Sequence, residues 1–473
     1  MWWDDAVIYQ IYPRSFQDSD GDGIGDLPGI ESRLDYLEST GISAAWLSPF
    51  YKSPNADFGY DVADYEAVDP VYGNLNDFDR LVGSAHQRGL RVLADFVGAH
   101  TSIDHRWFRE RPDFYFLAAE PPNNWRAAFG GPAWTREPAS GRFYLHSFFP
   151  EQADLNWRNA DVRSAMAGVL RFWLARGVDG FRLDAVDRLL KDPNLRDDPP
   201  AEAPHTLPLH EEYARLAHVH SRNAPDISTA LAAIREAVGS AYLVGEAYLP
   251  TAMLAPYLGP LDTVFAFEAM NADPIPALGT SIEAALDTGK AGWVLSNHDF
   301  SRLATRFGPN ARAAALLVLM LPGPVFMFQG DEIGMTDGPG VQPPRDRAGR
   351  DRFRHPMQWD DSEHAGFTDG TPWLPLIDPA ARNVEAQERD PDSSLNLFKR
   401  LVVLRRGLRP EIHFRKGSAS MLVLERDEYT VAVNFSDQPA TARRDGELVL
   451  EARPGDGADR QMIPPHGGWI TRG

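Results

Sequence analysis

The sequence predicts an α/β fold: a (β/α)8 TIM barrel with a small inserted domain after the third strand and a C-terminal antiparallel β-sandwich domain. Eight short β-branched or aromatic runs alternate with helix-period stretches. Strands that alternate with helices imply a parallel sheet, and eight such units fit a closed barrel better than an open sheet. From about residue 411 the pattern changes to alternating runs, which are typical of antiparallel strands.

The predicted elements follow one another along the chain at uneven spacing. Barrel strands are predicted for 7–11, 44–47, 91–96, 178–183, 241–244, 263–267, 292–295 and 324–328. Helices are predicted for the amphipathic stretches 30–39, 75–87, 162–175, 227–237, 282–285, 311–321 and 395–406. Strands of the C-terminal domain are predicted for 421–425, 430–434, 447–451 and 468–471.

Two long connections interrupt the predicted barrel. Roughly 80 residues separate the third and fourth strands, which is too long for a loop inside a compact unit. The second connection follows the eighth strand and is rich in Gly, Pro and Arg. The predicted domains are therefore the first part of the barrel at 1–99, an inserted domain B at 100–157, the second part of the barrel at 158–410 with a long excursion at 331–375, and the C-terminal β domain at 411–473.

Composition excludes several classes of function. The net charge of −20 repels phosphate backbones and anionic lipid, so neither nucleic acid nor a membrane is an expected partner, whereas a neutral substrate is compatible. The absence of Cys excludes disulfides, thiolate metal sites and Cys nucleophiles. No run approaches the roughly 20 apolar residues of a membrane span. The N-terminus lacks the layout of a secretory signal, which predicts a cytoplasmic protein. The oligomeric state stays open.

Acidic residues stand where the predicted barrel strands end. The active site of such a barrel lies at the C-terminal ends of its strands. The residues found there are Asp95 at the end of strand three and His100 after it, Arg182 and Asp184 at strand four, Glu246 at strand five, His298 and Asp299 at strand seven, and Asp331 with Glu332 after strand eight. We therefore expect carboxylates from several strands to converge on one mouth of the barrel.

Two of these acids have the pattern of a glycoside-cleaving pair. Arg182 and Asp184 are two apart on a strand and point to the same face, so the guanidinium favours an ionised, nucleophilic Asp184. Glu246 enters from the next strand, and repulsion among the carboxylates raises the pKa of at least one of them. A nucleophilic carboxylate beside a protonated one is the machinery of retaining glycoside cleavage.

Over nearly its full length the sequence resembles glycoside hydrolase family 13, the α-amylase family. The four motifs that carry the resemblance are DFVGAH at 95–100, GFRLDAV at 180–186, VGEA at 244–247 and LSNHD at 295–299. Further matches are AVIYQIYP at 6–13, DFGYD at 57–61 and PMQWD at 356–360. These resemble the α-glucosidase and oligo-1,6-glucosidase branch rather than endo-acting α-amylases.

The resemblance implies a role for each matching residue. Asp184 is the expected nucleophile, Glu246 the general acid/base, and Asp299 the group that holds the ring hydroxyls in the transition state. The residues expected to line the pocket for the non-reducing glucose are Asp57, Tyr60, His100, Phe148, Gln152, Arg182, His298, Arg350 and Arg354. A pocket closed at one end binds chain ends, so the expected substrate is a small α-glucoside cleaved from its end, without an organic cofactor.

An acidic loop near the N-terminus has the spacing of a cation site. Asp18, Asp20, Asp22 and Asp26 alternate with residues that include glycines, and oxygen ligands at this spacing suit Ca2+ or Mg2+. The loop starts like an EF-hand, but its twelfth position is Gly29 instead of a bidentate Glu. The resemblance adds the carbonyl of Ile24 as a ligand. We expect the ion to have a structural role.

Two positions depart from or vary within the family pattern. Relatives usually carry Asn immediately before the active-site His, and in α-amylases that Asn helps to bind a calcium ion. In this sequence Ala99 stands at that position. A second metal site, at this position, is therefore not expected. Beside the nucleophile, Ala185 is typical of relatives that prefer α-1,4 over α-1,6 bonds.

Three functions remain open at this stage. The first is a retaining α-glucosidase with α-1,4 bonds favoured. The second is a transglucosylase or isomerase acting on sucrose, maltose or trehalose, because sugar can intercept the covalent intermediate as water does. The loops at 265–271 and 331–373 decide between these two. The third is a non-catalytic binding module, which the presence of all three acids disfavours.

Overall fold

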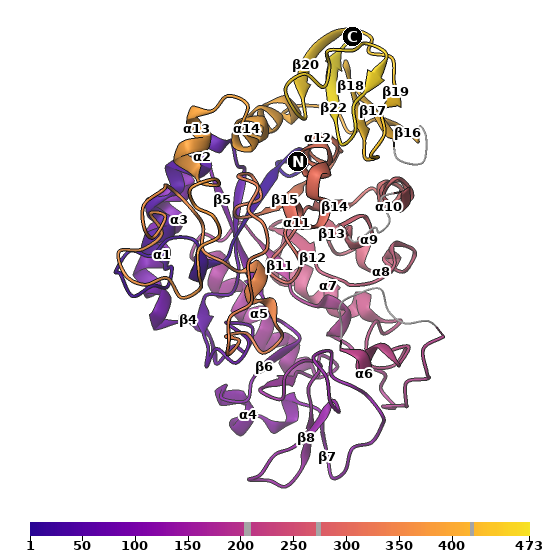
Figure 1. Cartoon of the computed structure of the whole chain (residues 1–473). Helices are drawn as coiled ribbons and strands as arrows, with labels where there is room; N and C mark the ends of the chain where they lie inside the picture. Colours follow the sequence, from indigo (N-terminus) through magenta and orange to yellow (C-terminus); the bar gives the residue numbers. More distant parts are fainter. Residues whose placement is uncertain (203–209, 271–275, 417–420) are drawn as a thin grey trace. The chain divides into compact units, whose positions relative to one another are not determined.

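The computed structural model describes residues 1–202, 210–270, 276–416 and 421–473. Eight parallel strands form a closed barrel in the order β1-β15-β14-β13-β12-β11-β5-β2 (Figure 1). Their bounds are β1 Val7–Ile11, β2 Ala44–Leu47, β5 Arg91–Phe96, β11 Gly180–Leu183, β12 Tyr242–Gly245, β13 Thr263–Phe265, β14 Ala291–Val294 and β15 Val325–Phe328. All eight predicted barrel strands are confirmed.

The barrel strands are buried along almost their whole length, as expected for a parallel sheet covered on both faces. Five of the barrel strands differ from their predicted bounds by one or two residues, and β13 shows a physical reason. β13 ends at Phe265, and the apolar run continues into the short helix α9, Phe267–Met270. A short apolar run does not by itself distinguish a strand from a buried helix.

The longer helices follow the predicted periodicity. They are α3 Leu75–Gln87, α5 Ala160–Ala175, α7 Ile227–Val238, α10 Pro276–Asp287, α12 Ala311–Leu319 and α14 Ser394–Arg405. The predicted helix at 30–39 is two helices, α1 Leu27–Ser32 and α2 Leu34–Thr40, separated at Arg33. Among the described residues, no helix combines the length and apolar character needed to cross a lipid bilayer.

The inserted segment contains short antiparallel strands of its own. β6 His100–Ser102 pairs with β10 Gln152–Asp154, and β7 Leu117–Ala118, β9 Phe143–Leu145 and β8 Trp134–Arg136 form a three-stranded sheet. Trp125 and Trp134 are the largest buried side chains of a small core beside these strands. The helix α4, Arg106–Glu110, lies in the same segment.

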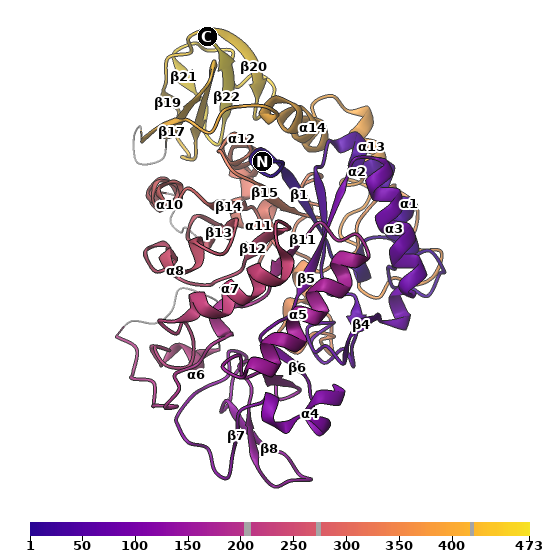
Figure 2. The same ribbon diagram turned by 180° about the vertical axis from the view of Figure 1, so that it is seen from behind.

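The C-terminal region is antiparallel, as predicted. A five-stranded sheet has the order β16-β17-β18-β22-β20, and a two-stranded sheet pairs β19 with β21 (Figure 2). The bounds are β16 His413–Lys416, β17 Met421–Arg426, β18 Tyr429–Asn434, β19 Ala440–Thr441, β20 Glu447–Glu451, β21 Met462–Ile463 and β22 Gly468–Arg472. Burial alternates along β17, which explains its alternating sequence.

By packing, the chain divides into two compact units. The first comprises 1–46, 83–91 and 266–473, and the second comprises 47–82 and 92–265. This division runs through the segments predicted as barrel, so the boundaries of the four domain segments predicted from the sequence stay a prediction.

Candidate active site

In the second unit, polar side chains from three neighbouring strands meet. Arg182 lies on β11, opposite Asp95 on β5, while Asp184 directly follows β11 and Glu246 directly follows β12. β11 pairs in parallel with both β5 and β12, so these residues share the carboxyl end of the sheet. The strand-end rule therefore correctly predicts that they come together.

One guanidinium contacts three carboxylates. Nη1 of Arg182 lies 2.7 Å from Oδ1 of Asp95 and 2.7 Å from Oδ1 of Asp184, and its Nη2 lies 2.5 Å from Oε2 of Glu246. Burial acts to lower the pKa of Arg182, but Asp95 and Glu246 outweigh it and hold that pKa well above its usual value. The arginine thus stays charged and brings Asp184 and Glu246 within reach of the same group.

The backbone after the two strands also ties Glu246 to the segment that carries Asp184. Oε2 of Glu246 accepts the Ala185 N–H at 3.2 Å, and its carbonyl accepts the Val186 N–H at 2.9 Å. Ala185 has φ +43°, a left-handed conformation that is strained for a residue with a Cβ. Oε1 of Glu246 accepts a hydrogen bond from the Tyr248 hydroxyl at 3.0 Å.

A second set of predicted residues lies together in the same unit. His100 Nε2 is 3.0 Å from the Tyr60 carbonyl oxygen, and Gln152 Nε2 donates to Oδ2 of Asp57 at 3.0 Å. The rings of His100 and Phe148 meet edge to face at 5.3 Å. Burial lowers the pKa of His100 to about 4, so its imidazole is neutral at pH 7.

Tyr60 connects this set to the arginine and its carboxylates. Its hydroxyl donates to Oδ2 of Asp95 at 3.1 Å, and the Arg182 guanidinium lies over its ring at 5.7 Å. The predicted residues that this unit brings together are Asp57, Tyr60, His100, Phe148, Gln152, Arg182, Asp184 and Glu246.

The first unit gathers the other predicted residues around Asp299. Oδ1 of Asp299 accepts from Arg350 Nη1 at 3.0 Å and from Arg354 Nη2 at 3.1 Å. Nε2 of His298 lies 3.4 Å from Oδ2 of Asp299, and Arg354 Nε donates to the His298 carbonyl at 2.9 Å. An Asx turn orients Asp299, because Oδ1 of Asn297 accepts its N–H at 2.9 Å.

Sequence reasoning missed two side chains that support these groups. Asp346 accepts from Arg350 at 2.6 Å and lies 3.7 Å from Arg354; burial acts to raise its pKa, but the two arginines prevail and lower it. The second side chain that sequence reasoning missed is Tyr248, whose hydroxyl donates to Glu246. Tyr248 stands two residues after a predicted catalytic acid, which is a usable signal, whereas nothing in the sequence around Asp346 marks it.

Two acids that the sequence grouped with the catalytic ones have internal partners instead. Glu332 accepts from the hydroxyls of Tyr9 at 2.7 Å and Tyr36 at 2.6 Å, and burial raises its pKa to about 7. Asp331 accepts from the Ser296 hydroxyl at 2.6 Å, and burial raises its pKa to about 6. Hydroxyl groups therefore bind both carboxylates, and a position after a strand does not predict such partners.

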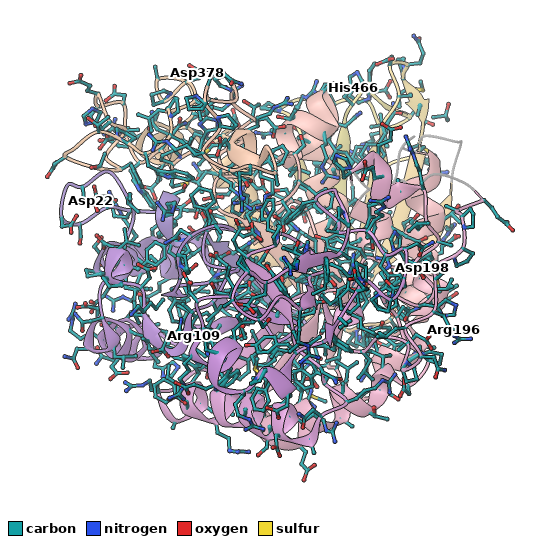
Figure 3. All side chains as sticks on the ribbon, turned by 90° about the horizontal axis from the view of Figure 1, so that it is seen from below. Asp22, Arg109, Arg196, Asp198, Asp378 and His466 are labelled. Atoms are coloured by element: carbon teal, nitrogen blue, oxygen red, sulfur yellow. The ribbon has the colours of Figure 1, made fainter. Side chains whose placement is uncertain are left out.

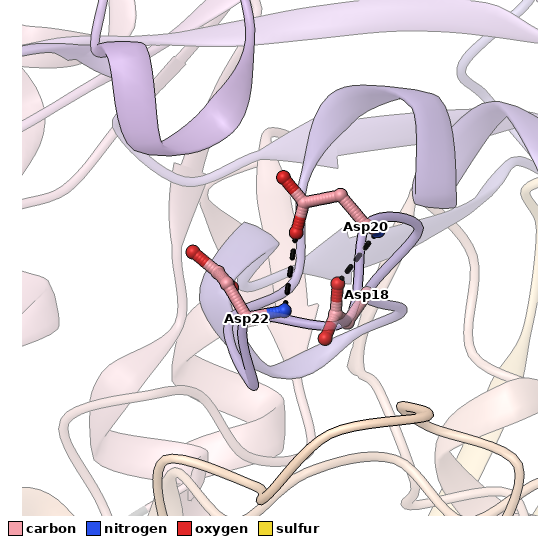
Figure 4. Close-up of side chains that lie close together, drawn as sticks. All are labelled: Asp18, Asp20 and Asp22. Carbon is pink, nitrogen blue, oxygen red and sulfur yellow. Dashed lines mark hydrogen bonds between the residues drawn. The ribbon is translucent and has the colours of Figure 1, made fainter.

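The acidic loop near the N-terminus brings three carboxylates together (Figure 4). Oxygens of Asp18, Asp20 and Asp22 lie within 4.8 Å of one another. Asp18 accepts the N–H groups of Asp20 and Gly21 at 3.0 and 2.9 Å, which wraps the backbone around it. Burial raises the pKa of Asp22, and the nearby acids Asp20 and Asp18 add to this effect. An all-oxygen cluster with mutual repulsion fits a hard divalent cation.

The two other predicted ligands have hydrogen-bond partners of their own. The carboxylate of Asp26 caps α1 by accepting the Gly29 N–H at 2.6 Å, and it also accepts the Ser19 N–H and hydroxyl at 3.0 and 2.9 Å. Asp26 is not part of the three-carboxylate group. Ile24 follows the group and donates its N–H to Asp22 at 2.7 Å.

Known proteins are similar to the chain over almost all of its length. Residues 10–411 match the family model of the α-amylase catalytic domain. A probable α-glucosidase of Rhizobium meliloti is 38% identical, over 93% of this chain and 90% of the relative. An oligo-1,6-glucosidase of Parageobacillus thermoglucosidasius is 36% identical, over 96% of this chain and 94% of the relative.

Solved structures agree with the sequence relatives. The α-glucosyl transfer enzyme XgtA is 36% identical with a TM-score of 0.91, covering 100% of this chain and 99% of that one. The trehalulose synthase MutB of Pseudomonas mesoacidophila MX-45 is 30% identical with a TM-score of 0.90, covering 100% and 99%. The chain therefore belongs to the α-amylase family, glycoside hydrolase family 13.

Proposed function

We propose that the protein is a retaining α-glucosidase that hydrolyses the terminal α-glucosidic bond, preferably α-1,4, of short oligosaccharides or glucosides. The observation that carries the proposal is the contact of one guanidinium, that of Arg182, with both Asp184 and Glu246. Retaining enzymes hold their two carboxyl groups about 5–5.5 Å apart, a spacing that a shared guanidinium favours. Relatives named α-glucosidase and oligo-1,6-glucosidase support it.

The proposed reaction has two displacements. The Asp184 carboxylate attacks the anomeric carbon while Glu246, protonated, donates its proton to the glycosidic oxygen, and the aglycone leaves as an alcohol. Glu246 then takes a proton from water, whose oxygen attacks the same carbon and releases Asp184. Two inversions return the α-anomer. Because Arg182 stays charged, it keeps Asp184 ionised for the first step.

Roles in binding sugar hydroxyls are proposed for polar residues of each unit, taken separately. Asp299, kept anionic by Arg350 and Arg354, would accept hydrogen bonds from ring hydroxyls together with His298. A neutral His100 can both donate to and accept from a hydroxyl, which suits an uncharged sugar. The other proposed contacts are Asp57, Tyr60, Phe148 and Gln152.

A transglucosylase or isomerase is the second candidate function. XgtA and the trehalulose synthase, both at TM-scores of 0.90 or above, favour it. The same catalytic residues serve either outcome, because the acceptor of the glucosyl group decides the product. Of the two loops that the sequence analysis named as decisive, the one at 265–271 ends at Asn271, outside the described residues.

An NMR time course tests the proposal. Maltose, isomaltose, sucrose and trehalose are supplied separately to the purified protein. We expect maltose to be consumed fastest. The anomer is read with 4-nitrophenyl α-glucoside, because its only glucose comes from the cleaved bond, and α-glucose should appear before β-glucose since mutarotation is slower than turnover. Prompt β-glucose from this glucoside would contradict a retaining mechanism, a new disaccharide as main product would establish the transferase, and no turnover of any substrate would favour the non-catalytic binding module.

We further propose that the loop at Asp18, Asp20 and Asp22 holds Ca2+, or else Mg2+, with the carboxylate of Asp26 and the carbonyl of Ile24 as additional ligands. The cation would neutralise the three clustered carboxylates. Asp18 also accepts a hydrogen bond from the Thr368 hydroxyl at 2.5 Å, so the ion would stabilise a contact between segments far apart in the sequence. Its role is therefore proposed as structural.

A cytoplasmic location and the absence of an organic cofactor stay predictions.

Removing the cation is expected to destabilise the protein more than it slows the reaction. A ligand present at 100 times its Kd adds about 2.7 kcal/mol to the free energy of unfolding, so chelation should lower Tm by a few °C. Activity at 25 °C should fall less than twofold. Differential scanning fluorimetry with and without EDTA checks this.

The matched variants are Asp20→Asn, which removes a ligand charge, and Asp361→Asn, an exposed acid outside the loop. Asp20→Asn should abolish the response of Tm to EDTA, and Asp361→Asn should keep it. An unchanged Tm of the wild-type protein in EDTA argues against the site.

A further inference from the structure

A groove of about 1240 Å³ lies within the second unit, apart from the residues proposed for catalysis. Its walls come from β3 (Tyr51–Lys52) and β4 (Asp64–Val68), from α4 and the residues on either side of it, and from α5 as far as Val169. Figures 1 and 2 label β4, α4 and α5. Among the described residues that line it are none of those proposed to bind or cleave the terminal glucose. It is larger than a typical small-ligand pocket of roughly 300–1,000 Å³, so it has room for several sugar units.

An aromatic side chain in the wall is held rigidly. Trp107 is partly exposed, and its ring packs on His105 with centroids 4.4 Å apart and edge to face on Phe114 at 5.3 Å. Tyr65 lies 5.9 Å from it on the β4 side. A fixed indole offers a large contact area at little entropic cost, and its negative π face attracts the weakly positive C–H groups of a sugar ring.

Beside Trp107 lies a buried donor that faces the groove. His105 is 3% exposed, and its Nδ1 accepts the Trp107 N–H at 3.1 Å. Burial lowers the pKa of His105 to about 4; Asp64 opposes this effect and Arg106 adds to it. The neutral ring at pH 7 therefore carries its hydrogen on Nε2. No described residue accepts a hydrogen bond from that nitrogen, and His105 lines the groove. A buried N–H without a protein partner is the kind of group that a ligand hydroxyl satisfies.

The charges of the groove are balanced. Four basic and four acidic side chains line it, so no net charge selects an anion or a cation. Arg111 is paired with Asp161 at 2.8 Å, whereas Lys52 and Arg109 have no side-chain partner among the described residues. Figure 3 labels Arg109. Donors and acceptors spread around an aromatic platform suit a neutral, hydroxyl-rich ligand.

We propose that this groove is a second, non-catalytic binding site for a neutral oligosaccharide, which stacks on Trp107 and accepts a hydrogen bond from Nε2 of His105. The chemistry of the groove identifies the ligand as a saccharide. The choice of an α-1,4-linked glucose chain rests on the proposed function. A bound chain would keep substrate near the enzyme without being cleaved in the groove.

Calorimetric titration with maltotriose tests the site while the catalytic pocket is filled with the imino sugar 1-deoxynojirimycin. Three variants probe the groove: Trp107→Ala, His105→Asn, and Arg109→Ala. Asn in place of His105 keeps an oxygen that can cap α4 but removes the far donor. Arg171→Ala on α5, exposed and outside the groove, is the matched control for the arginine variant.

We expect one maltotriose to bind per chain with the catalytic pocket filled. His105→Asn and Trp107→Ala should weaken it about tenfold or more, while hydrolysis of 4-nitrophenyl α-glucoside changes less than twofold. Arg109→Ala should weaken it by a smaller factor, and Arg171→Ala should not change it. Absence of maltotriose binding, or binding that His105→Asn and Trp107→Ala both leave unchanged, overturns the proposal. If the protein bound maltotriose in this way but hydrolysed no glucoside, the proposed function would be wrong and the proposed binding site in the groove would still stand.

Discussion

The Asp184→Asn enzyme is expected to lose turnover of maltose by about 10⁴-fold or more, the scale on which removal of a catalytic nucleophile acts. An amide has nearly the shape of the carboxylate but cannot form the glucosyl ester. The fold should survive, because Arg182 keeps its contacts with Asp95 and Glu246 after the substitution. Initial rates on maltose and thermal unfolding of the same preparation check both statements.

The matched control for this variant is Asp226→Asn, which breaks a surface ion pair with Arg158. Surface ion pairs contribute about 0–1 kcal/mol to the free energy of unfolding. The control should therefore keep a Tm close to that of the wild type and a rate within twofold of it. If Asp184→Asn retained activity within tenfold of the wild type, Asp184 would not be the nucleophile. A large fall in Tm for Asp184→Asn alone would instead identify it as a structural partner of Arg182.

The barrel was predictable because its strands are buried on both faces. Such strands are short, nearly continuous apolar runs, and β1, β2 and β5 begin and end where those runs do. The strands of two or three residues in the inserted segment, such as β7, are too short to show any period. The break between α1 and α2 at Arg33 was missed as well, because the apolar pattern continues through it.

The candidate site was predictable where topology alone places residues. Strand ends bring Arg182, Asp184 and Glu246 to one edge of the sheet whatever the loops do. The rule does not predict hydrogen-bond partners, such as the hydroxyls of Tyr9 and Tyr36 that bind the carboxylate of Glu332. Asp346 was missed because it lies in a loop, where no periodicity relates a residue to its neighbours in space.

The loss of activity in the Glu246→Gln enzyme is expected to depend on the leaving group of the substrate. The loss should be large where the leaving oxygen must be protonated and small where it leaves as a stable anion. On maltose, whose leaving group is a sugar alcohol, the rate should fall about 10²–10⁴-fold, the usual contribution of a general acid. With 2,4-dinitrophenyl α-glucoside the phenolate leaves unaided, so formation of the glucosyl ester should slow much less. The ester should then accumulate, because water has lost its general base, and azide should restore turnover by attacking from the face opposite Asp184, which gives α-glucosyl azide.

Rates on both substrates, with and without azide, separate this role from a structural one. Tyr248→Phe is the matched control, since it removes a hydrogen-bond donor to Glu246 but leaves the carboxyl group in place. It should keep most of its activity on maltose and show no azide product. A Glu246→Gln enzyme that slowed equally on both substrates, without rescue by azide, would have lost a structural contact of Arg182 rather than a proton donor. Selective loss on maltose with azide rescue requires that the group at position 246 act on the glycosidic oxygen and then on water, from the face of the sugar opposite Asp184.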